Sequence, residues 1–531
     1  MNKKVSKILL VCGAVVLTSG SSVGVVTQAA NACPNQVGNV ANSSLPVKYD
    51  PRPWSTPIRN QHGVNGEDPQ YICWSYSGND MLTYAKQKTF GITTVYSPNY
   101  TNFATATNAL TEGVNATNNQ EHRLDGGGHL AAASVFAFMG NNPVRESDFS
   151  SVDAEGFATG KIASTPISSA ELDVARAKAD NSYTVTDIER VGYESGDVTH
   201  TEHINTLKES ILKYGSVGYA YNAYTTHVGL DDYLSGYFDE ENNALNTVAE
   251  GYNGIRISTI NHATLIVGYD DNYSKDKFNP EHQPQNNGAF LVRNSWGTEF
   301  GENGYFWVSY EDYYIKASVG ASSVKLGVKQ RGFEQSLHQS SPRNAPFYVA
   351  YPDDYLGGGN QTNYSSGKNS DIVLGTYFPA KDHQLTLNSI AIDTDLDKVD
   401  YEVYLVNGSF CQSTTLEDLK AQGKLIKKGI ETKQGLHRKS IKPVDIPANQ
   451  DYSLVIVERA PDKTINNMAA SLFVSCNAVD TFNVKNSWIG YINSDEMITW
   501  NNFANVSTQN PSGGARTGSV IPYLFAFSTT K

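Results

Sequence analysis

Cysteine is scarce in this chain of 531 residues, which contains only five cysteines and five methionines. The cysteines are Cys12, Cys33, Cys73, Cys411 and Cys476. Exported chains normally use cysteines in pairs, but so few leave room for little more than one disulfide bond, between Cys411 and Cys476. Cys73 is not part of this candidate disulfide bond, which makes it a candidate for another role.

Positive charge is also lacking. The chain has 41 lysine and arginine residues against 54 acidic ones, which gives a formal net charge of −13. This balance argues against nucleic acid and anionic lipid as the main partners. No internal repeat is long enough to indicate a solenoid. With 39% hydrophobic and 18% charged residues, the composition is that of a globular protein of two to three domains.

Long apolar runs are missing except near the N-terminus. Three lysines, Lys3, Lys4 and Lys7, precede an apolar stretch at residues 8–17, and small residues follow up to Ala30 and Ala32. The stretch is shorter than the roughly 20 residues that span a bilayer. We therefore predict a signal peptide at 1–30, a short lead-in at 31–44 and export from the cell, with lipidation at Cys33 as the less favoured alternative.

Residues 45–318 mix two periodicities. Helical spacing of apolar residues is found at 73–87, 130–139 and 203–214, whereas strand patterns occupy 264–269, 289–292 and 305–310. A helical half followed by a β-rich half predicts an α+β domain with a cleft between two lobes.

The remainder of the chain reads differently. Residues 319–344 lose periodicity and are predicted to be a connector. Residues 345–531 are nearly all strand and turn, as at 390–392, 401–406 and 453–457. This alternation predicts an all-β sandwich as a second domain.

A cysteine, a histidine and an asparagine follow one another in the first domain. Cys73 begins a predicted helix, whose N-terminal dipole lowers a thiol pKa, and His262 begins a strand pattern. Asn294 lies further on, with Trp296 placed to shield a bond between the histidine and the asparagine from water. A thiolate nucleophile with an oriented imidazole base needs these residue types. We predict that Cys73, His262 and Asn294 form a catalytic triad.

The residues around this triad resemble the papain family of cysteine peptidases over roughly residues 45–318. Residues 294–305 are similar to the family almost residue for residue, residues 45–52 look like the start of a mature enzyme, and residues 57–61 look like its oxyanion-hole segment. The resemblance implies a two-lobed papain-like fold in which Gln61 and the Cys73 amide stabilise the oxyanion. It further implies that Gly127 and Gly128 pair with the substrate backbone.

The same resemblance places Asn261 and Trp296 beside the substrate. Two departures accompany it. Gln61 lies 12 residues before Cys73, further than is usual in the family, so Gln70 is kept as an alternative for the oxyanion hole. Cys73 and His262 are 189 residues apart, beyond the roughly 130–150 of the family. We therefore expect surface insertions around 150–200 and 222–258.

The second domain resembles, diffusely, the lectin-like β-domain that follows the peptidase domain in some bacterial surface cysteine proteases. Trp488, Trp500, Asn501 and Asn502 are candidates for sugar contacts or for the core, and we favour a structural or docking role. The acidic stretch at 393–400 partly matches a calcium loop but lacks its glycine and final glutamate. We expect no cofactor and no metal in the peptidase site, with calcium in the second domain as the weaker alternative.

The sequence thus predicts a secreted cysteine endopeptidase that is a monomer and acts on proteins or peptides. It is expected outside the cell, either free or held non-covalently at the surface through contacts of the second domain with wall or surface glycan. Two alternatives stay open. One is a cell-wall peptide amidase with the same Cys–His chemistry, and the other is a non-catalytic adhesin on a protease scaffold.

Overall fold

The structure is a computed structural model in which Ser43–Lys531 form one compact unit. It describes residues 45–62, 72–107, 130–150, 169–191, 199–226, 235–248, 260–328, 336–338, 371–459, 474–475, 487–501, 506–509, 515–520 and 525–530, apart from single residues 131, 139, 319, 379 and 395. The predicted signal peptide and lead-in lie outside the described residues. No helix among those described is long and apolar enough to cross a membrane.

The helical half of the first domain is built around α1 (Cys73–Phe90), which is buried along most of its length. Its end is set by Gly91, whose φ of 69° is accessible to glycine. The predicted helices at 73–87, 130–139 and 203–214 are confirmed. The described helices of this domain are α1, α2 (Pro98–Thr107), α3 (Ala132–Phe138), α5 (Ser169–Arg176), α6 (His200–Tyr214) and α7 (Tyr313–Lys316).

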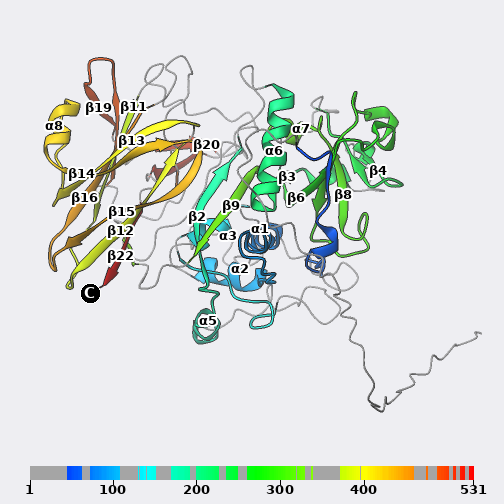
Figure 1. Cartoon of the computed structure of the whole chain (residues 1–531), viewed down its shortest axis with the longest axis horizontal. Helices are drawn as coiled ribbons and strands as arrows, with labels where there is room; N and C mark the ends of the chain where they lie inside the picture. Colours follow the sequence, from blue (N-terminus) through cyan, green and yellow to red (C-terminus); the bar gives the residue numbers. More distant parts are fainter. Residues whose placement is uncertain are drawn as a thin grey trace, which may run out of the picture. The chain divides into compact units, whose positions relative to one another are not determined.

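Helix α6 has capping residues at both ends, which explain why the helix forms where the sequence predicts it. Thr199 accepts from the backbone of Glu202 and the Glu202 carboxylate accepts from the backbone of Thr199, which is a complete capping box. Gly215 ends the helix with a φ of 97°. Helix α6 packs beside the sheet that carries His262 (Figure 1).

The β-rich half contains a seven-stranded sheet in the order β1-β6-β7-β8-β5-β4, with β3 pairing to β6. Its long strand β6 (His262–Asp270) pairs with β7 (Ala289–Arg293), which pairs with β8 (Tyr305–Ser309). These three strands confirm the predicted ones. The others are β1 (Lys48–Tyr49), β3 (Val217–Tyr221), β4 (Phe238–Asp239) and β5 (Ala244–Leu245).

Helix α1 joins the two halves because it packs against both α3 and β6. The contact with α3 requires a glycine on α1: a Cβ on Gly78 would lie 2.6 Å from the Cβ of Ala133. The core around α1 includes Leu82 together with Leu265 and Leu291 of the sheet. Two lobes with one shared helix form the predicted papain-like architecture.

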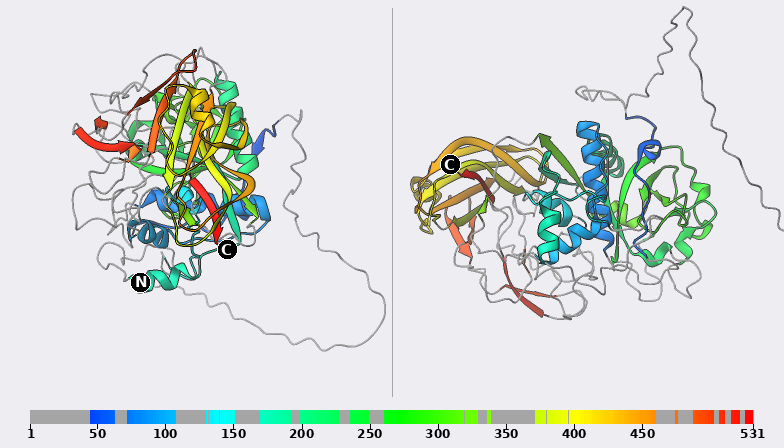
Figure 2. Two further views of the ribbon diagram at one scale, coloured as in Figure 1. Left: turned by 90° about the vertical axis from the view of Figure 1, so that its left-hand side faces the viewer. Right: turned by 90° about the horizontal axis from the view of Figure 1, so that it is seen from below.

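The C-terminal part is a β-sandwich, also as predicted. One sheet has the order β14-β13-β16-β11-β18-β19, and the other has β10-β22-β12-β15-β2-β9. Figure 2 shows the strands of this part, in yellow to red, from two further sides. Apolar side chains of both sheets, such as Val403 and Ile390, form a common core. The strands are β10 (Ser336–His338), β11 (Asp371–Phe378), β12 (Leu385–Thr394), β13 (Val399–Asn407), β14 (Lys424–Glu431), β15 (Gly435–Ile446), β16 (Tyr452–Arg459), β18 (Ser487–Ile492), β19 (Ile498–Asn501) and β22 (Phe525–Thr530).

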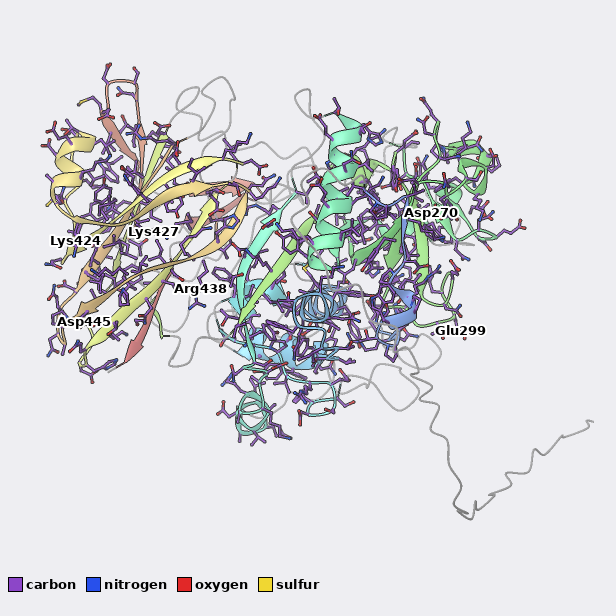
Figure 3. All side chains as sticks on the ribbon, in the orientation of Figure 1. Asp270, Glu299, Lys424, Lys427, Arg438 and Asp445 are labelled. Carbon is purple, nitrogen blue, oxygen red and sulfur yellow. The ribbon has the colours of Figure 1, made fainter. Side chains whose placement is uncertain are left out.

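Smaller elements complete this part: helix α8 (Leu416–Ala421) and a three-stranded sheet of β17 (Val474–Ser475), β21 (Ala515–Val520) and β20 (Val506–Gln509). The outer strand β14 carries Lys424 and Lys427, which Figure 3 labels. Lys427 Nζ donates to the Ser440 carbonyl on β15 at 3.0 Å. Lysine on a strand at the edge of a sheet discourages pairing with another chain.

One sheet of the sandwich continues into strands that come from the N-terminal part of the chain. Strand β2 (Tyr183–Arg190) pairs with β15 on one side and with β9 (Ser322–Val328) on the other. The sequence predicted a surface insertion around 150–200, but β2 is an inner strand of a sheet with half of its residues buried, which corrects that expectation for residues 183–190. Strand β9 lies within the predicted connector 319–344, whose lack of periodicity concealed a strand. The predicted domain boundaries otherwise stay a prediction.

Candidate active site

Cys73 is the first residue of α1 and its side chain is buried, with 8% of the residue exposed. The helix N-terminus has no side-chain cap, since Ile72 at the N-cap position offers no acceptor. The backbone groups of Cys73 and Trp74 interact with the sulfur, whereas the Ser75 amide donates to the Ile72 carbonyl at 2.8 Å. The sequence thus placed Cys73 correctly at a helix N-terminus.

His262 and Asn294 lie at the ends of two neighbouring strands. His262 begins β6, and Asn294 follows directly after β7, so antiparallel pairing of these strands brings their ends together. His262 Nε2 and Asn294 Oδ1 are 2.8 Å apart. Because an amide oxygen only accepts, Nε2 carries the proton in this bond. The residues are only 4% and 3% exposed, which protects the bond from competition by water.

Aromatic rings enclose His262. Trp296 stacks on the imidazole with ring centroids 4.4 Å apart and planes inclined by 21°. Tyr221, on β3, meets the same imidazole edge-on at 5.6 Å. Phe300 in turn packs edge-on against Trp296 at 4.9 Å. Trp296 therefore lies against the imidazole that bonds to Asn294, and its role as a shield from water stays a prediction.

A hydrogen bond ties α1 to the strand of the histidine. Ser77, one turn after Cys73, donates its hydroxyl to the Ala263 carbonyl at 2.7 Å. Since Ala263 follows His262, this buried bond fixes the register between the cysteine helix and the histidine strand. The sequence interpretation did not single out Ser77, although its spacing of four residues from Cys73 put it on the same helical face.

Gln61 is buried, and hydrogen bonds with Ser295, the residue after Asn294, hold both its backbone and its side chain. Its amide N donates to the Ser295 carbonyl at 2.8 Å, and its Oε1 accepts from the Ser295 hydroxyl at 2.6 Å. This arrangement leaves Nε2 as the donor of the Gln61 side chain. The alternative, Gln70, lies outside the described residues.

Burial raises the pKa of the Cys73 thiol above its ordinary value, although backbone groups of Ala263 and Trp74 act in the opposite direction. Backbone groups at the helix N-terminus act in the expected direction, but desolvation outweighs them, so the net shift is opposite to the predicted lowering of the thiol pKa. A second device is needed to generate a thiolate, and an imidazolium ion supplies such a device.

The structure describes only some of the predicted substrate-binding residues. Asn261 accepts from the Ala223 amide through Oδ1 at 2.7 Å, so its side chain holds the neighbouring loop. Gly127 and Gly128 lie outside the described residues, and their role stays a prediction.

The residues of the second domain that were considered for ligands are engaged in protein contacts. Asp393 accepts from Arg190 at 3.0 Å, and Asp397 accepts from Lys433 and from the Gln434 amide. Within the described part of the chain, no cluster of histidine, cysteine or carboxylate residues is suited to a metal ion. The calcium alternative thus gains no support from these residues.

The aromatic and cysteine candidates can be placed as well. Trp488 and Trp500 pack around Phe410, which favours the core role over sugar binding. Asn501 is placed only by its backbone, and Asn502 lies outside the described residues. Cys411 is an exposed free thiol, and Cys476 is outside the described range.

The fold is similar to that of papain-type cysteine peptidases, and a family comparison agrees over part of the chain. Residues 146–323 match the papain family cysteine protease model, which supports a cysteine-type peptidase. The match includes His262 and Asn294. Gln61 and Cys73 precede the matched residues, so their placement beside His262 and Asn294 rests on the structure.

Two solved structures share the fold over most of the chain. One is a variant of the clostridial cysteine protease Cwp84 after propeptide cleavage, with a TM-score of 0.61, 20% identity, and coverage of 91% of this chain and 100% of that one. The other holds the cysteine protease and lectin-like domains of Cwp84, a surface layer associated protein of Clostridium difficile, with the same score and identity and coverage of 92% and 90%. These likenesses support a papain-like fold followed by a β-rich domain. No curated protein sequence matches the chain.

Proposed function

We propose that the chain is a secreted cysteine endopeptidase that cleaves protein substrates through Cys73, His262 and Asn294. The observation that carries the proposal is the buried 2.8 Å bond from His262 to Asn294 beneath Trp296, at the strand that Ser77 ties to the cysteine helix. Such an oriented imidazole next to a helix N-terminal thiol is the arrangement that thiol-based acyl transfer requires.

In the proposed reaction, the Cys73 thiol gives its proton to His262 Nδ1, because Nε2 is already bonded to Asn294. The thiolate attacks the substrate carbonyl carbon and forms a tetrahedral oxyanion. His262 then protonates the leaving amine, and the C–N bond breaks to leave a thioester. Water, deprotonated by His262, attacks the thioester and releases the acid product and the free thiol.

Gln61 and the Cys73 backbone amide stabilise the oxyanion in this proposal. Support comes from the Ser295 hydroxyl, which holds Gln61 Oε1 and so fixes which way the Nε2 donor points. A donor that is oriented before the reaction lowers the barrier because it needs no reorganisation when charge develops. Gln70 is the alternative donor.

We further propose that the enzyme acts as a monomer outside the cell or on its surface. The N-terminal sequence pattern supports export, and the surface layer association of Cwp84 supports a surface location. The β-sandwich is proposed to dock the enzyme non-covalently at the wall or its glycan. Proteins or peptides, and not nucleic acid, are the proposed substrates.

The test is a peptide-library cleavage profile of the unmodified chain beside the Cys73→Ala variant. We expect the unmodified chain to cleave internal peptide bonds, and the variant to lose at least about 10³-fold of kcat, because the nucleophile is absent. Hydrolysis that survives in Cys73→Ala contradicts the proposal.

The same assay separates the alternatives when purified cell wall is supplied beside protein. Release of wall peptides without cleavage of protein would identify the amidase. An unmodified chain that cleaves neither substrate and whose Cys73 resists thiol-directed epoxides would identify the non-catalytic adhesin.

A further inference from the structure

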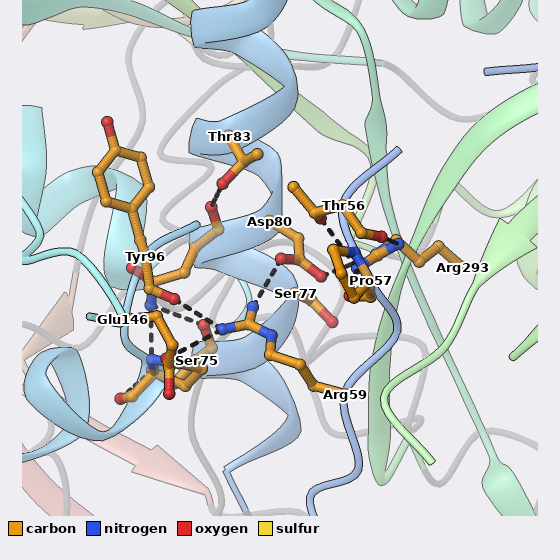
Figure 4. Close-up of polar contacts among 12 residues, drawn as sticks. Thr56, Pro57, Arg59, Ser75, Ser77, Asp80, Thr83, Tyr96, Glu146 and Arg293 are labelled. Carbon is orange, nitrogen blue, oxygen red and sulfur yellow. Dashed lines mark hydrogen bonds and ion pairs between the residues drawn. The ribbon is translucent and has the colours of Figure 1, made fainter. Parts of the chain in front are cut away.

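A single buried carboxylate links the segments that carry three of the four proposed catalytic groups, Cys73, Gln61 and Asn294. Asp80 lies on α1, two turns after Cys73, and is 6% exposed. Figure 4 shows it between two arginines that approach from different segments. Arg59 Nη2 donates to Asp80 Oδ1 at 2.6 Å, and Arg293 Nε donates to Asp80 Oδ2 at 2.9 Å.

Each of the two arginines lies within two residues of a proposed catalytic residue, which makes this contact relevant to the site. Arg59 precedes Gln61 by two residues, and Arg293 directly precedes Asn294. One carboxylate thus connects the helix that begins with Cys73 to the segment of Gln61 and to the segment of Asn294. Asp80 with Arg59 and Arg293 is called the Asp80 clamp below.

Each arginine of the clamp is also fixed on its far side. Arg59 Nη1 donates to the Tyr96 carbonyl at 2.7 Å, and its backbone carbonyl accepts from Gly297 at 3.1 Å. Arg293 donates to the Thr56 and Pro57 carbonyls at 2.9 and 2.8 Å. Thr56 and Pro57 belong to the segment that leads to Gln61, so Arg293 braces the asparagine and glutamine segments against each other.

The electrostatics agree with a permanently charged clamp. Burial alone would raise the pKa of Asp80, but the charges of Arg293 and Arg59 hold that pKa below its ordinary value. A buried carboxylate between two guanidinium groups stays ionised across the working pH range of an enzyme. Removing it would leave Arg293 buried without this counter-ion and Arg59 with the more distant Glu146 carboxylate, 3.4 Å from its Nη1, and the segments that they belong to would move.

We propose that Asp80 is a positioning residue for the reaction, which sets the distance between Cys73, Asn294 and Gln61 through Arg59 and Arg293. The inference rests on the proposed function. It predicts that loss of the carboxylate slows the chemical step more than it weakens substrate binding, because displacement of reacting groups by a fraction of an ångström acts on the transition state.

The chain offers a matched control on the same helix. Lys86 of α1 forms an equally buried ion pair with Asp180, which also bonds to Tyr96 and Ser182. None of these partners adjoins a proposed catalytic residue in the sequence. Tyr96 bonds to Asp180 through its hydroxyl and to Arg59 through its carbonyl, so Asp180→Asn breaks a buried ion pair of α1 without removing a group that bonds to Asp80, Arg59 or Arg293.

The experiment compares Asp80→Asn with Asp180→Asn at a temperature at which both are folded by circular dichroism. We expect kcat of Asp80→Asn to fall by about tenfold or more with KM within about twofold of the unmodified chain, while Asp180→Asn keeps its kcat within about twofold. An unchanged kcat in Asp80→Asn overturns the inference. So does an equal loss in both variants, since that would reflect general destabilisation.

If Asp80→Asn does not fold, the Arg59→Lys variant tests the inference in its place. The lysine keeps a charge beside Asp80 but loses the fork that also reaches the Tyr96 carbonyl, so we expect kcat to fall by about threefold or more at constant KM. An unchanged kcat in this variant overturns the clamp.

A readout that does not need turnover separates the clamp from the proposed function. The rate of Cys73 alkylation by iodoacetamide is measured against pH in each variant. The clamp predicts a displaced profile in Asp80→Asn and an unchanged one in Asp180→Asn. Lack of peptide hydrolysis by the unmodified chain would refute the proposed function alone, whereas identical alkylation profiles would refute the clamp.

Discussion

His262 is a strand residue whose environment comes from two other segments, the one that carries Asn294 and Trp296 and strand β3. Its bond to Asn294 comes from the end of β7, its stacked ring from Trp296 and its edge contact from Tyr221 of β3. The enclosure restricts the imidazole to one orientation, in which Nε2 faces Asn294. A base that is fixed in this way loses little entropy in the transition state.

Removal of the stacked ring should therefore impair the base. We expect Trp296→Ala to lower kcat by about tenfold or more, because water reaches the His262–Asn294 bond and the imidazole gains freedom. Steady-state kinetics on a peptide substrate measure the effect. Trp500→Ala is the control, since Trp500 packs in the β-sandwich and bonds to the Ser413 carbonyl. A kcat equal to that of the control would contradict the role of Trp296.

The sequence predicted the residues that lie in recognisable local motifs and missed those that meet only in space. Cys73, His262 and Asn294 were found because each sits in a segment with its own signature. Asp80 and Tyr221 were missed, since nothing in a single sequence indicates that a helical aspartate will meet two arginines more than 20 and 200 residues away. Their signal lies in the tertiary structure.

At the scale of elements, α1 carries the site and is held by three buried ion pairs, two of them to Asp80. Asp80 anchors it near the nucleophile, and Asp180 binds Lys86 towards its other end. Although burial opposes ionisation, hydrogen bonds from Lys86 and Ser182 lower the pKa of Asp180 to about 2. Both carboxylates are thus more acidic in the folded chain than aspartate in an unfolded one, which has a pKa of about 3.9.

This difference predicts acid sensitivity. A carboxylate with a depressed folded-state pKa contributes stability that is fully present above its unfolded pKa and is lost as the pH falls towards the folded value. We expect the free energy of unfolding to decrease as the pH falls from about 5 to about 2. Urea unfolding at a series of pH values measures it. Asp180→Asn should show a shallower decrease, and an unchanged slope would contradict the assignment.

The elements themselves were predictable where periodicity was strong, as in α1 and β6. Strands β2 and β9 were not, because they pair with each other and β2 pairs with a strand about 250 residues away in the chain. Their residues read locally as an insertion and a connector. Long-range pairing of this kind overrides weak local preference.

At the scale of the whole molecule, the sheet β9-β2-β15 joins the peptidase part to the β-sandwich. Arg190 of β2 donates to Asp393 at 3.0 Å and to the Thr394 carbonyl at 2.7 Å on β12. His437 of β15 is buried with its Nδ1 3.0 Å from Asp187 of β2. Burial would raise the pKa of Asp187, but the bond with His437 leads the interactions that lower it to about 2. The junction is therefore polar and highly connected.

Weakening this junction should destabilise both parts together. We expect Arg190→Met to lower the free energy of unfolding by about 3 kcal/mol, because Asp393 is left buried without its cation. The exposed pair of Arg176 and Asp173 provides the control, and Arg176→Met should cost less than about 1 kcal/mol. Denaturant unfolding with two spectroscopic probes makes the comparison. A separate transition for each domain, with the peptidase part unaffected, would contradict a shared sheet.

The central claim is that Cys73 performs the chemistry, and kinetic labelling of its thiol during turnover tests it most directly. The chain is treated with a thiol-directed epoxide while peptide hydrolysis is followed, and mass spectrometry locates the label. The exposed free thiol of Cys411 serves as the internal reference. We predict that activity is lost in proportion to the labelling of Cys73, that Cys411 reacts far more slowly, and that Cys73→Ala neither hydrolyses the peptide nor takes up the label there. Activity that persists after Cys73 is fully labelled, or in Cys73→Ala, would contradict the account.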